Sequence, residues 1–244
     1  EGKRILDSFV KLPGKELRIL KTEVTQKLYQ DVMGSNPSYY KGDNNPVEKV
    51  SWYDAIYFCN KLSEKLGFTP VYAVDGKTDV ATWNYTPHNG NSIRGKVTQN
   101  TKANGFRLPT EEDWLALGKV IGAESEKYGV IEGVTAKRMA DAQFNGVTMW
   151  DYWPAVGTIT NESRFSAIPA GYLNLGARTE TGAYPEAASY GVYEYAAFWT
   201  ADSVEGEDGM AYYRYMMATQ PDLFISKGDK ANFGASVRCV RDAQ

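Results

Sequence analysis

Hydrophobic and polar residues alternate most clearly near the C-terminal end of the chain, in AYYRYMM (211–217). A period of two is typical of a β-strand, because successive side chains of a strand point to opposite faces. We therefore expect Tyr213 and Tyr215 to share an exposed face, with Tyr212, Arg214 and Met216 facing inward. Because a buried guanidinium without a partner is costly, Arg214 should be hydrogen-bonded there.

A second short β-run, GASVRCV (234–240), has Val237 and Cys239, with Phe233 just before it, available for burial. The stretch between the two runs, TQPDLFISKGDKANFG (219–234), contains a proline and two glycines and predicts a loop held at both ends. Such a loop is suited to contact with a ligand. The alternative is an ordinary hairpin whose aromatic side chains cover its own core.

Capping residues indicate the helices. The first is predicted between Thr25, as N-cap, and Gly34, just past its end. The second starts at Ser51, which forms the pattern of a capping box with Asp54, and ends at Gly67. Apolar residues at intervals of three and four predict its buried face: Tyr53, Ile56, Cys59, Leu62 and Leu66.

A third helix is predicted to begin at Thr110, because Asp113 follows three residues later. The dipeptide Asp75-Gly76 is typical of a two-residue hairpin turn. Apolar pieces within the first 20 residues predict edge strands. Residues 122–190, rich in aromatics and glycine, predict loops and short strands packed by their own Trp and Tyr side chains.

Composition narrows the class of protein. The 244 residues are 43% hydrophobic, enough for a substantial core, and the absence of a repeat or linker favours one domain over residues 1–244. A formal charge of −3 and no basic stripe argue against nucleic acid as a partner. No apolar run approaches membrane-spanning length, so anchoring to a membrane would require a segment outside this chain.

The sequence offers little chemistry for catalysis or metal binding. His88 is the single histidine, which leaves no second imidazole to share a metal. The acidic run DSVEGEDG (202–209) would recruit calcium through Asp202, Glu205 and Asp208, but the spacing follows no calcium-loop rule and favours a solvated loop. We expect no metal and no cofactor. The cysteines are either two inert buried thiols or one disulfide.

Several segments together resemble the formylglycine-generating-enzyme type of sulfatase-modifying domain. They occur in the order found in that family: TEVT, PVEKVSWYDAIYFCNKLS, FRLPTEEDW, YGVYEY, FWTAD and FGASVRCVRD. The resemblance covers most of the chain and implies an α+β, C-type-lectin-like fold with two main helices, short strands and much irregular structure. It also implies that the helix of Cys59 lies beside the last strand, close to Cys239.

The chain differs from that family at the positions of the family's catalytic and calcium-binding residues. The active enzymes of that family have two cysteines just before the segment that matches residues 213–215. In this chain, Glu207 and Tyr212 align with those two cysteines. Without thiolates, a copper-dependent oxidation of cysteine has no metal site. The family's calcium-binding segment corresponds to AAFWTAD (196–202), which is shortened and lacks its asparagine. The resemblance therefore implies the scaffold without catalytic or metal-binding residues.

Within this fold, the chain resembles the variable proteins of diversity-generating retroelements, whose C-terminal segment, here 198–242, is the diversified one. Randomised adenines turn AAC codons into codons for residues such as Tyr, Asp, Ser or Phe, but not Trp, Met or Lys. Trp199, Met216 and Lys230 are therefore expected to be scaffold. The candidate ligand-binding residues are Ser203, Asp208, Tyr213, Tyr215, Thr219, Pro221, Asp222, Leu223 and Phe224.

The resemblance predicts a non-enzymatic receptor or display protein at the cell surface or outside the cell, binding a variable ligand, most readily a protein. The alternatives are a formylglycine-generating-type oxidase acting on a cysteine of a sulfatase peptide, and a carbohydrate-binding lectin module. If residues 203–226 are a display surface, substitutions there should leave folding nearly untouched, because exposed positions usually cost within about 0.5 kcal/mol.

Overall fold

The computed structural model describes residues 1–12, 15–134, 143–144, 147–150, 161, 163–174 and 188–242. Four α-helices and five small antiparallel sheets make up this part of the chain, an α+β architecture as expected. The helices are α1 (Gly2–Leu6), α2 (Gln26–Met33), α3 (Trp52–Lys65) and α4 (Glu111–Val120), with a 3₁₀ turn η1 (Val80–Thr82).

The strands are short except for two neighbours near the C-terminal end. In chain order they are β1 (Phe9–Lys11), β2 (Leu17–Leu20), β3 (Tyr72–Val74), β4 (Val97–Gln99), β5 (Phe106–Arg107), β6 (Gln143–Phe144), β7 (Val147–Thr148), β8 (Tyr172–Asn174), β9 (Ala188–Tyr190), β10 (Tyr195–Val204), β11 (Glu207–Met217), β12 (Phe224–Asp229), β13 (Phe233–Gly234) and β14 (Val240–Asp242).

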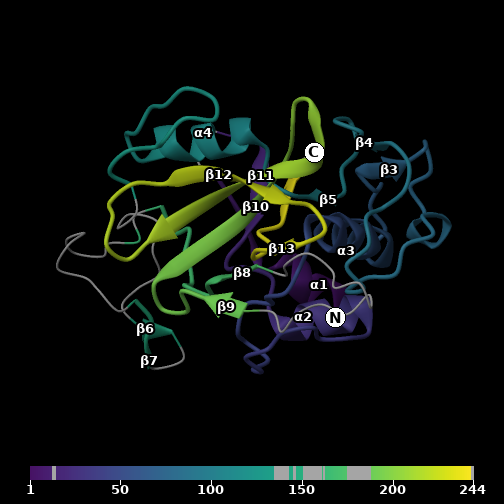
Figure 1. Cartoon of the computed structure of the whole chain (residues 1–244), viewed down its shortest axis with the longest axis horizontal. Helices are drawn as coiled ribbons and strands as arrows, with labels where there is room; N and C mark the ends of the chain where they lie inside the picture. Colours follow the sequence, from purple (N-terminus) through teal and green to yellow (C-terminus); the bar gives the residue numbers. More distant parts are fainter. Residues whose placement is uncertain are drawn as a thin grey trace.

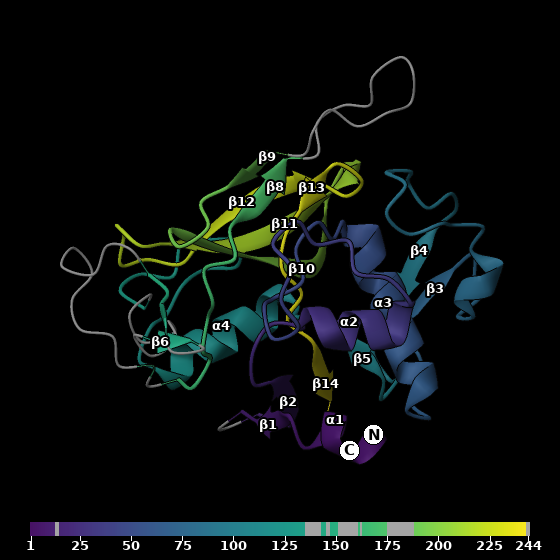
Figure 2. The same ribbon diagram turned by 90° about the horizontal axis from the view of Figure 1, so that it is seen from below.

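The elements form three layers. Sheets β10-β11-β12 and β13-β8-β9 form one side of the molecule, and their long strands face the viewer in Figure 1. Helices α2, α3 and α4 lie behind them, and the sheet β1-β2-β14-β5 closes the opposite side (Figure 2). The hairpin of β10 and β11 is thus placed on an outer layer, where it can meet a partner.

The predicted helix caps are confirmed. The Thr25 hydroxyl accepts from the Leu28 N–H, and Gly34 ends α2 in the left-handed conformation with a φ of 82°. Both α3 and α4 begin with a complete capping box, in which Ser51 and Thr110 each exchange hydrogen bonds with an aspartate three residues later. Helix α3 buries more than the expected face, because Trp52 and Phe58 are also inside.

The hairpin turn at Asp75-Gly76 is also confirmed. Both residues have positive φ, 48° and 80°, and Val74 and Lys77 exchange two backbone hydrogen bonds across the turn. This is the type I′ geometry that an Asp-Gly pair favours, since glycine adopts positive φ without a steric cost.

Two expectations for the N-terminal part were wrong. Ile5 and Leu6 lie in α1 and not in an edge strand. Strand β2 is an inner strand, because β14 from the other end of the chain pairs with it, Val240 opposite Ile19. Sequence patterns do not show such a long-range partner.

The C-terminal expectations need two corrections. Residues 224–229 are not loop but strand β12, which pairs with β11 from Tyr215↔Phe224 to Met210↔Asp229. The run GASVRCV is not one strand, because its backbone bonds to several elements in turn. The Ser236 N–H donates to the Ala197 carbonyl, and the Val237 and Cys239 carbonyls accept from β-strand and loop residues near the N-terminus.

The core has two hydrophobic clusters, and β10 lies between them. Alternate side chains of this strand enter different clusters: Ala197 and Trp199 join the cluster around α3, and Ala196 and Phe198 join the cluster around α4. A strand that is buried on both faces has little freedom to change sequence. Strand β10 therefore supports the outer strands β11 and β12 of the same sheet.

Trp199→Ala should destabilise the protein by roughly 3–5 kcal/mol, as large-to-small replacements in cores do. Trp199 is fully buried, and its indole N–H donates to the Val50 carbonyl at 3.0 Å. The matched control is Tyr39→Ala, at a ring that is 65% exposed, which should cost within about 0.5 kcal/mol. Denaturant unfolding of both variants measures the difference; equal costs would place Trp199 outside the core.

Cys59 and Cys239 are close together, as expected, and both are free thiols in the core, with Sγ atoms 4.0 Å apart. Burial raises the pKa of the Cys59 thiol, and the neighbouring Cys239 raises it further. Neither thiol should react with iodoacetamide in the native protein, because both are fully buried and out of reach of the reagent. After unfolding without reductant, mass spectrometry should find both alkylated. Two unmodified cysteines at that stage would reveal a disulfide instead.

Candidate functional site

Aromatic rings from six strands, β8 to β13, form a continuous surface on the outer layer. Tyr213 stacks on Phe233 with ring centroids 4.4 Å apart, and Tyr215 stacks on Phe224 at 5.4 Å. Tyr172 extends the set, because it stacks on Phe233 at 5.8 Å. We call this set the aromatic platform; its members are Tyr172, Tyr190, Tyr195, Tyr213, Tyr215, Phe224 and Phe233.

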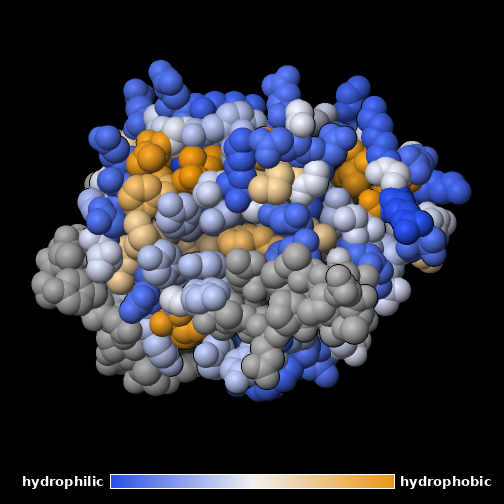
Figure 3. All heavy atoms as spheres, in the orientation of Figure 1, coloured by the Kyte–Doolittle hydropathy of each residue, from blue (hydrophilic) through white to orange (hydrophobic). Residues whose placement is uncertain are grey.

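The platform is half-buried, so each ring both packs and faces outward. Tyr190 is 49% exposed, and the other members have intermediate exposure. Seen from this side, the molecule has pale and tan atoms across its middle, below a rim of blue, hydrophilic ones (Figure 3). Burial raises the pKa of Tyr213 and of Tyr215, so both hydroxyls stay protonated and can donate hydrogen bonds.

Trp199 and Gly228 support the platform from below. The Trp199 ring contacts Phe233 edge-on at 5.5 Å and Tyr213 at 6.2 Å. A β-carbon at Gly228 would lie 2.9 Å from both the Trp199 and Phe233 rings. Glycine at this position in β12 is therefore required by the close approach of two rigid rings. In the sequence, this glycine is one of the residues that predict a loop over 219–234, which includes residues 224–229.

A buried ion pair fixes the opposite face of the same strand. Arg214, fully buried in β11, donates through Nε and Nη2 to the carboxylate of Glu111 in the first turn of α4. Its Nη1 donates to the Gly129 carbonyl at 2.7 Å. Glu111 also accepts from the Tyr128 N–H at 3.0 Å. The expectation that Arg214 is hydrogen-bonded inside is confirmed, and Met216 is buried beside it.

The predicted alternation of β11 holds only in part. Tyr213 and Tyr215 are half-buried and not fully exposed, because they pack on Phe233 and Phe224. Tyr212, expected to face inward, is also half-buried and stacks on Tyr128 with centroids 4.3 Å apart. Both faces of β11 therefore carry aromatic rings that are partly open to solvent.

The predicted site residues fall into separate groups. Tyr213, Tyr215 and Phe224 meet in the platform. Ser203 and Asp208 are exposed near the tip of the β10–β11 hairpin, and Thr219 and Pro221 are exposed beyond its other end. At about 3.3 Å per residue, β11 alone spans more than 30 Å. A single compact ligand cannot touch both outer groups.

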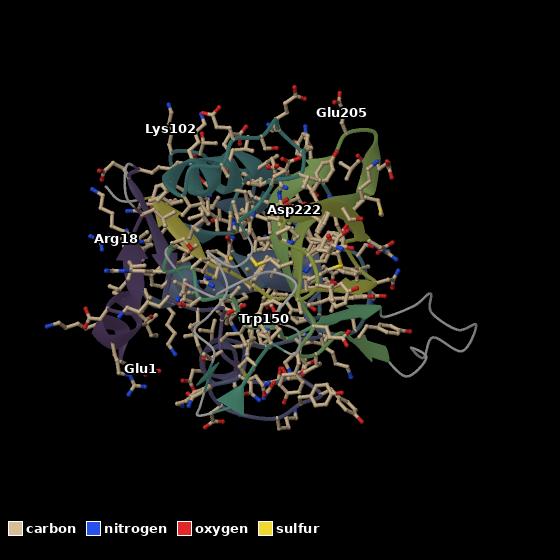
Figure 4. All side chains as sticks on the ribbon, turned by 90° about the vertical axis from the view of Figure 1, so that its left-hand side faces the viewer. Glu1, Arg18, Lys102, Trp150, Glu205 and Asp222 are labelled. Carbon is tan, nitrogen blue, oxygen red and sulfur yellow. The ribbon has the colours of Figure 1, made fainter. Side chains whose placement is uncertain are left out.

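Two predicted site residues have structural contacts. Leu223 is fully buried, and its backbone forms a pair of hydrogen bonds with Ile131, so it belongs to the core and not to a binding surface. Asp222 is half-buried and accepts from the Gly133 N–H at 2.7 Å. Figure 4 shows Asp222 well away from Glu205 at the tip of the hairpin. Substitutions across 203–226 are therefore not uniformly neutral, contrary to the expectation for a pure display surface.

Three platform residues were absent from the predicted site. Tyr172, Tyr190 and Tyr195 precede the C-terminal segment. Tyr172 and Tyr190 reach the platform because β8 pairs with both β13 and β9, and Tyr195, at the start of β10, contacts the Tyr172 ring at 5.7 Å. The density of aromatics in residues 122–190 was visible in the sequence and was assigned to local packing. Residues 135–142, 145–146, 151–160, 162 and 175–187 of that region lie outside the described part of the chain.

His88 belongs to a cluster of polar side chains with Tyr29, Asp54 and Tyr85. Its Nε2 lies 2.9 Å from the Tyr29 hydroxyl, and its Nδ1 lies 3.1 Å from an oxygen of Asp54. Burial alone would raise the pKa of Asp54, but hydrogen bonds from His88 and Tyr85 and the charge of His88 outweigh it and lower that pKa. Tyr29 and Asp54 are buried, whereas the His88 side chain is half-buried.

The acidic run forms the hairpin between β10 and β11. Asp202 accepts from the Glu111 N–H at 3.0 Å, at the start of α4, while Glu205 and Asp208 are exposed. Among the described residues, no group of three or more His, Cys, Asp or Glu side chains is arranged to hold a metal ion.

No described helix is long and apolar enough to cross a membrane.

The comparisons with known proteins assign a family. The chain belongs to the family of the Fibrobacter succinogenes major domain, whose model matches residues 22–241. The chain is also similar to "Chaperone protein LppX" of Paenibacillus barcinonensis, with 48% identity over 97 residues. That match covers 38% of this chain and about a third of the relative's length, 32%.

Two solved structures share the fold. Treponema denticola variable protein 1 matches with a TM-score of 0.55 and 22% identity, over 93% of this chain and 84% of its own. CarF matches with a TM-score of 0.52 and 19% identity, over 93% and 87% of the two chains. At this level of identity the likeness concerns the fold alone: a mixed α+β, lectin-like architecture.

Glu111→Gln should destabilise the protein by roughly 3–5 kcal/mol, because it leaves the buried Arg214 cation without a counter-charge. The neighbouring Glu112 gives a matched control, since it pairs with Lys127 at 2.7 Å on the exposed surface. Glu112→Gln should cost less than about 1 kcal/mol. Denaturant unfolding compares the two variants; a cost for Glu111→Gln no larger than for Glu112→Gln would show that the buried pair contributes little.

Proposed function

We propose that this chain is a non-enzymatic ligand-binding protein, with a formylglycine-generating-enzyme-type, lectin-like scaffold that displays a retroelement-diversified segment, residues 198–242. The single observation that carries the proposal is the aromatic platform. Half-exposed rings gathered on an outer sheet are costly to leave in water unless a partner covers them. Tyrosine and phenylalanine are also the side chains that give large contact area at a small loss of conformational entropy.

Pre-ordered rings favour tight binding. Tyr213 and Tyr215 are held by stacking on Phe233 and Phe224, and the strand beneath them is fixed by Arg214 and Glu111. A surface that is ordered before it binds loses little entropy on association. The flat, mostly uncharged platform suits a protein ligand, whose own apolar and aromatic groups pack against it.

Burial supports the division between diversified and fixed positions. The residues expected to be scaffold are inside: Trp199 and Met216 are fully buried, and Lys230 is 6% exposed. Lys230 donates to the Asp208 carbonyl at 2.8 Å and lies 4.6 Å over the Trp52 ring. Of the candidate variable positions, Leu223 alone is buried.

The proposal that the chain is not an enzyme is supported by where its cysteines lie. Both are in the core, away from the platform, so neither can act as the accessible thiolate that a copper-dependent oxidation of cysteine requires. Display at the cell surface or outside the cell is part of the same proposal. A surface that varies between copies is useful where it meets molecules from outside.

The encoding DNA gives the most direct test. The proposal expects a near-copy of codons 198–242 close to the coding sequence, differing from it at adenines of the copy. The differences should fall in the codons of Tyr213, Tyr215 and Phe224 and should spare those of Trp199 and Met216. Differences spread evenly over buried and exposed codons would contradict diversification.

Two small libraries test display at the protein level. The first replaces Tyr215, Thr219, Pro221 and Phe224 by NNC codons; the second does the same at Phe198, Trp199, Arg214 and Met216. Protease resistance of surface-displayed clones should be kept by most of the first library and lost by most of the second, because the exposed and half-buried positions of the first library cost much less on substitution than the fully buried positions of the second. Equal losses in both libraries would contradict a display surface.

A further inference from the structure

A cavity lies apart from the predicted ligand-binding residues, none of which lines it. It is a cavity of about 460 Å³, within the range of roughly 300–1,000 Å³ that is common for small-molecule sites. The described residues of its wall come from four parts of the chain: the start of α2, the connector between α2 and α3, the segment before β8, and the turn before β10. The wall is largely apolar, formed by Pro46, Met149, Ile168, Pro169, Ala170 and Val192.

Two tyrosines that are exposed to solvent line the same cavity. Tyr40 is 47% exposed and Tyr193 is 41% exposed. Tyr193 has a φ of 71°, a left-handed conformation that L-residues rarely adopt, and its N–H donates to the Pro169 carbonyl at 2.9 Å. Such strain costs about 1–3 kcal/mol and is concentrated at functional sites. Here the strained residue is an aromatic one at a cavity.

Glu48 is the charged side chain of the described wall. It is 5% exposed, and one carboxylate oxygen accepts from the Tyr40 N–H at 2.9 Å. Its other oxygen, Oε2, is buried without a hydrogen-bond partner. Gln26, a buried polar residue of the same wall, contrasts with it, because its amide nitrogen and its amide oxygen are both hydrogen-bonded within the protein.

Nearby lysines do not pair with this carboxylate. The Lys41 ammonium donates to the Asn36 carbonyl at 2.9 Å, and the Lys49 ammonium lies 5.8 Å over the Tyr39 ring. Among the described residues, neither lysine forms an ion pair with Glu48. Burial raises the pKa of Glu48, and hydrogen bonds from the Tyr40 and Tyr39 N–H groups, together with the charges of Lys49 and Lys41, lower it only in part. A buried acid of this kind gains from a cationic ligand.

We infer that this cavity binds a methylated alkylammonium ion, with Glu48 as its counter-charge and the rings of Tyr40 and Tyr193 beside it. Tyrosine rings attract cations, and quaternary ammonium groups are commonly recognised by aromatic rings. The apolar wall favours a methylated cation over a primary one, because a primary ammonium brings three N–H donors that need acceptors. The methyl groups of a quaternary ion pack against apolar carbons instead.

Three related alcohols test the inference on the unmodified protein. Choline carries the quaternary ammonium, 3,3-dimethylbutan-1-ol is its neutral isostere, and 2-aminoethanol carries a primary ammonium. Titration calorimetry should detect choline binding, with both other probes weaker by roughly tenfold or more, since aromatic contacts to a desolvated cation are worth about that factor. No binding of choline, or equal binding of choline and its neutral isostere, would overturn the inference.

Two substitutions locate the binding. Glu48→Gln keeps the shape of the side chain and removes its charge, and it should weaken choline binding by roughly tenfold. Tyr193→Gly removes the ring and relieves the positive φ, so it should weaken choline binding without lowering the melting temperature. Tyr128→Gly, at another exposed tyrosine with positive φ that lies outside the described wall, is the matched control and should bind choline like the unmodified protein. Unchanged choline affinity in both cavity variants, in folded protein, would also overturn the inference.

Discussion

The buried pair of Arg214 and Glu111 is the interaction on which the outer layer depends. A guanidinium inside a protein is tolerated only when its donors are satisfied, and here a carboxylate and two backbone carbonyls satisfy them. These partners belong to α4, to the loop that follows it and to the turn before β12. One side chain therefore fixes β11 against three separate parts of the chain, and so fixes the position of the platform.

The two faces of β11 have different surroundings. Residues that face α4, such as Arg214 and Met216, are buried and specific, while Tyr213 and Tyr215 on the other side are half-exposed and touch mainly other rings. Since neighbouring side chains of a strand point to opposite faces, changes on one face need not disturb the other. This arrangement allows a binding surface to vary above a constant frame.

The platform and the Glu48 cavity are the two surfaces that we propose for binding, and they differ in character. The platform is open, aromatic and built largely by the C-terminal strands, and it suits a large partner. The cavity is concave and carries one buried carboxylate, and it suits a small cation. The turn before β10 joins them, because Tyr190 belongs to the platform and Tyr193 to the cavity wall. Occupancy of either site thus involves the same short segment of chain.

Local interactions determined what the sequence predicted well. The caps at Thr25, Ser51 and Thr110 and the Asp75-Gly76 turn depend on residues within four positions of each other, and all were read correctly from the sequence. The resemblance, and not local pattern, predicted that Cys59 and Cys239 are close. Only the tertiary structure decided that residues 224–229 form a strand, since Gly228 is a packing requirement of Trp199 and Phe233 and not a turn signal. It also decided that Leu223 is core and that Tyr172, Tyr190 and Tyr195 join the platform, because those contacts connect residues far apart in the chain, where a sequence pattern carries no information.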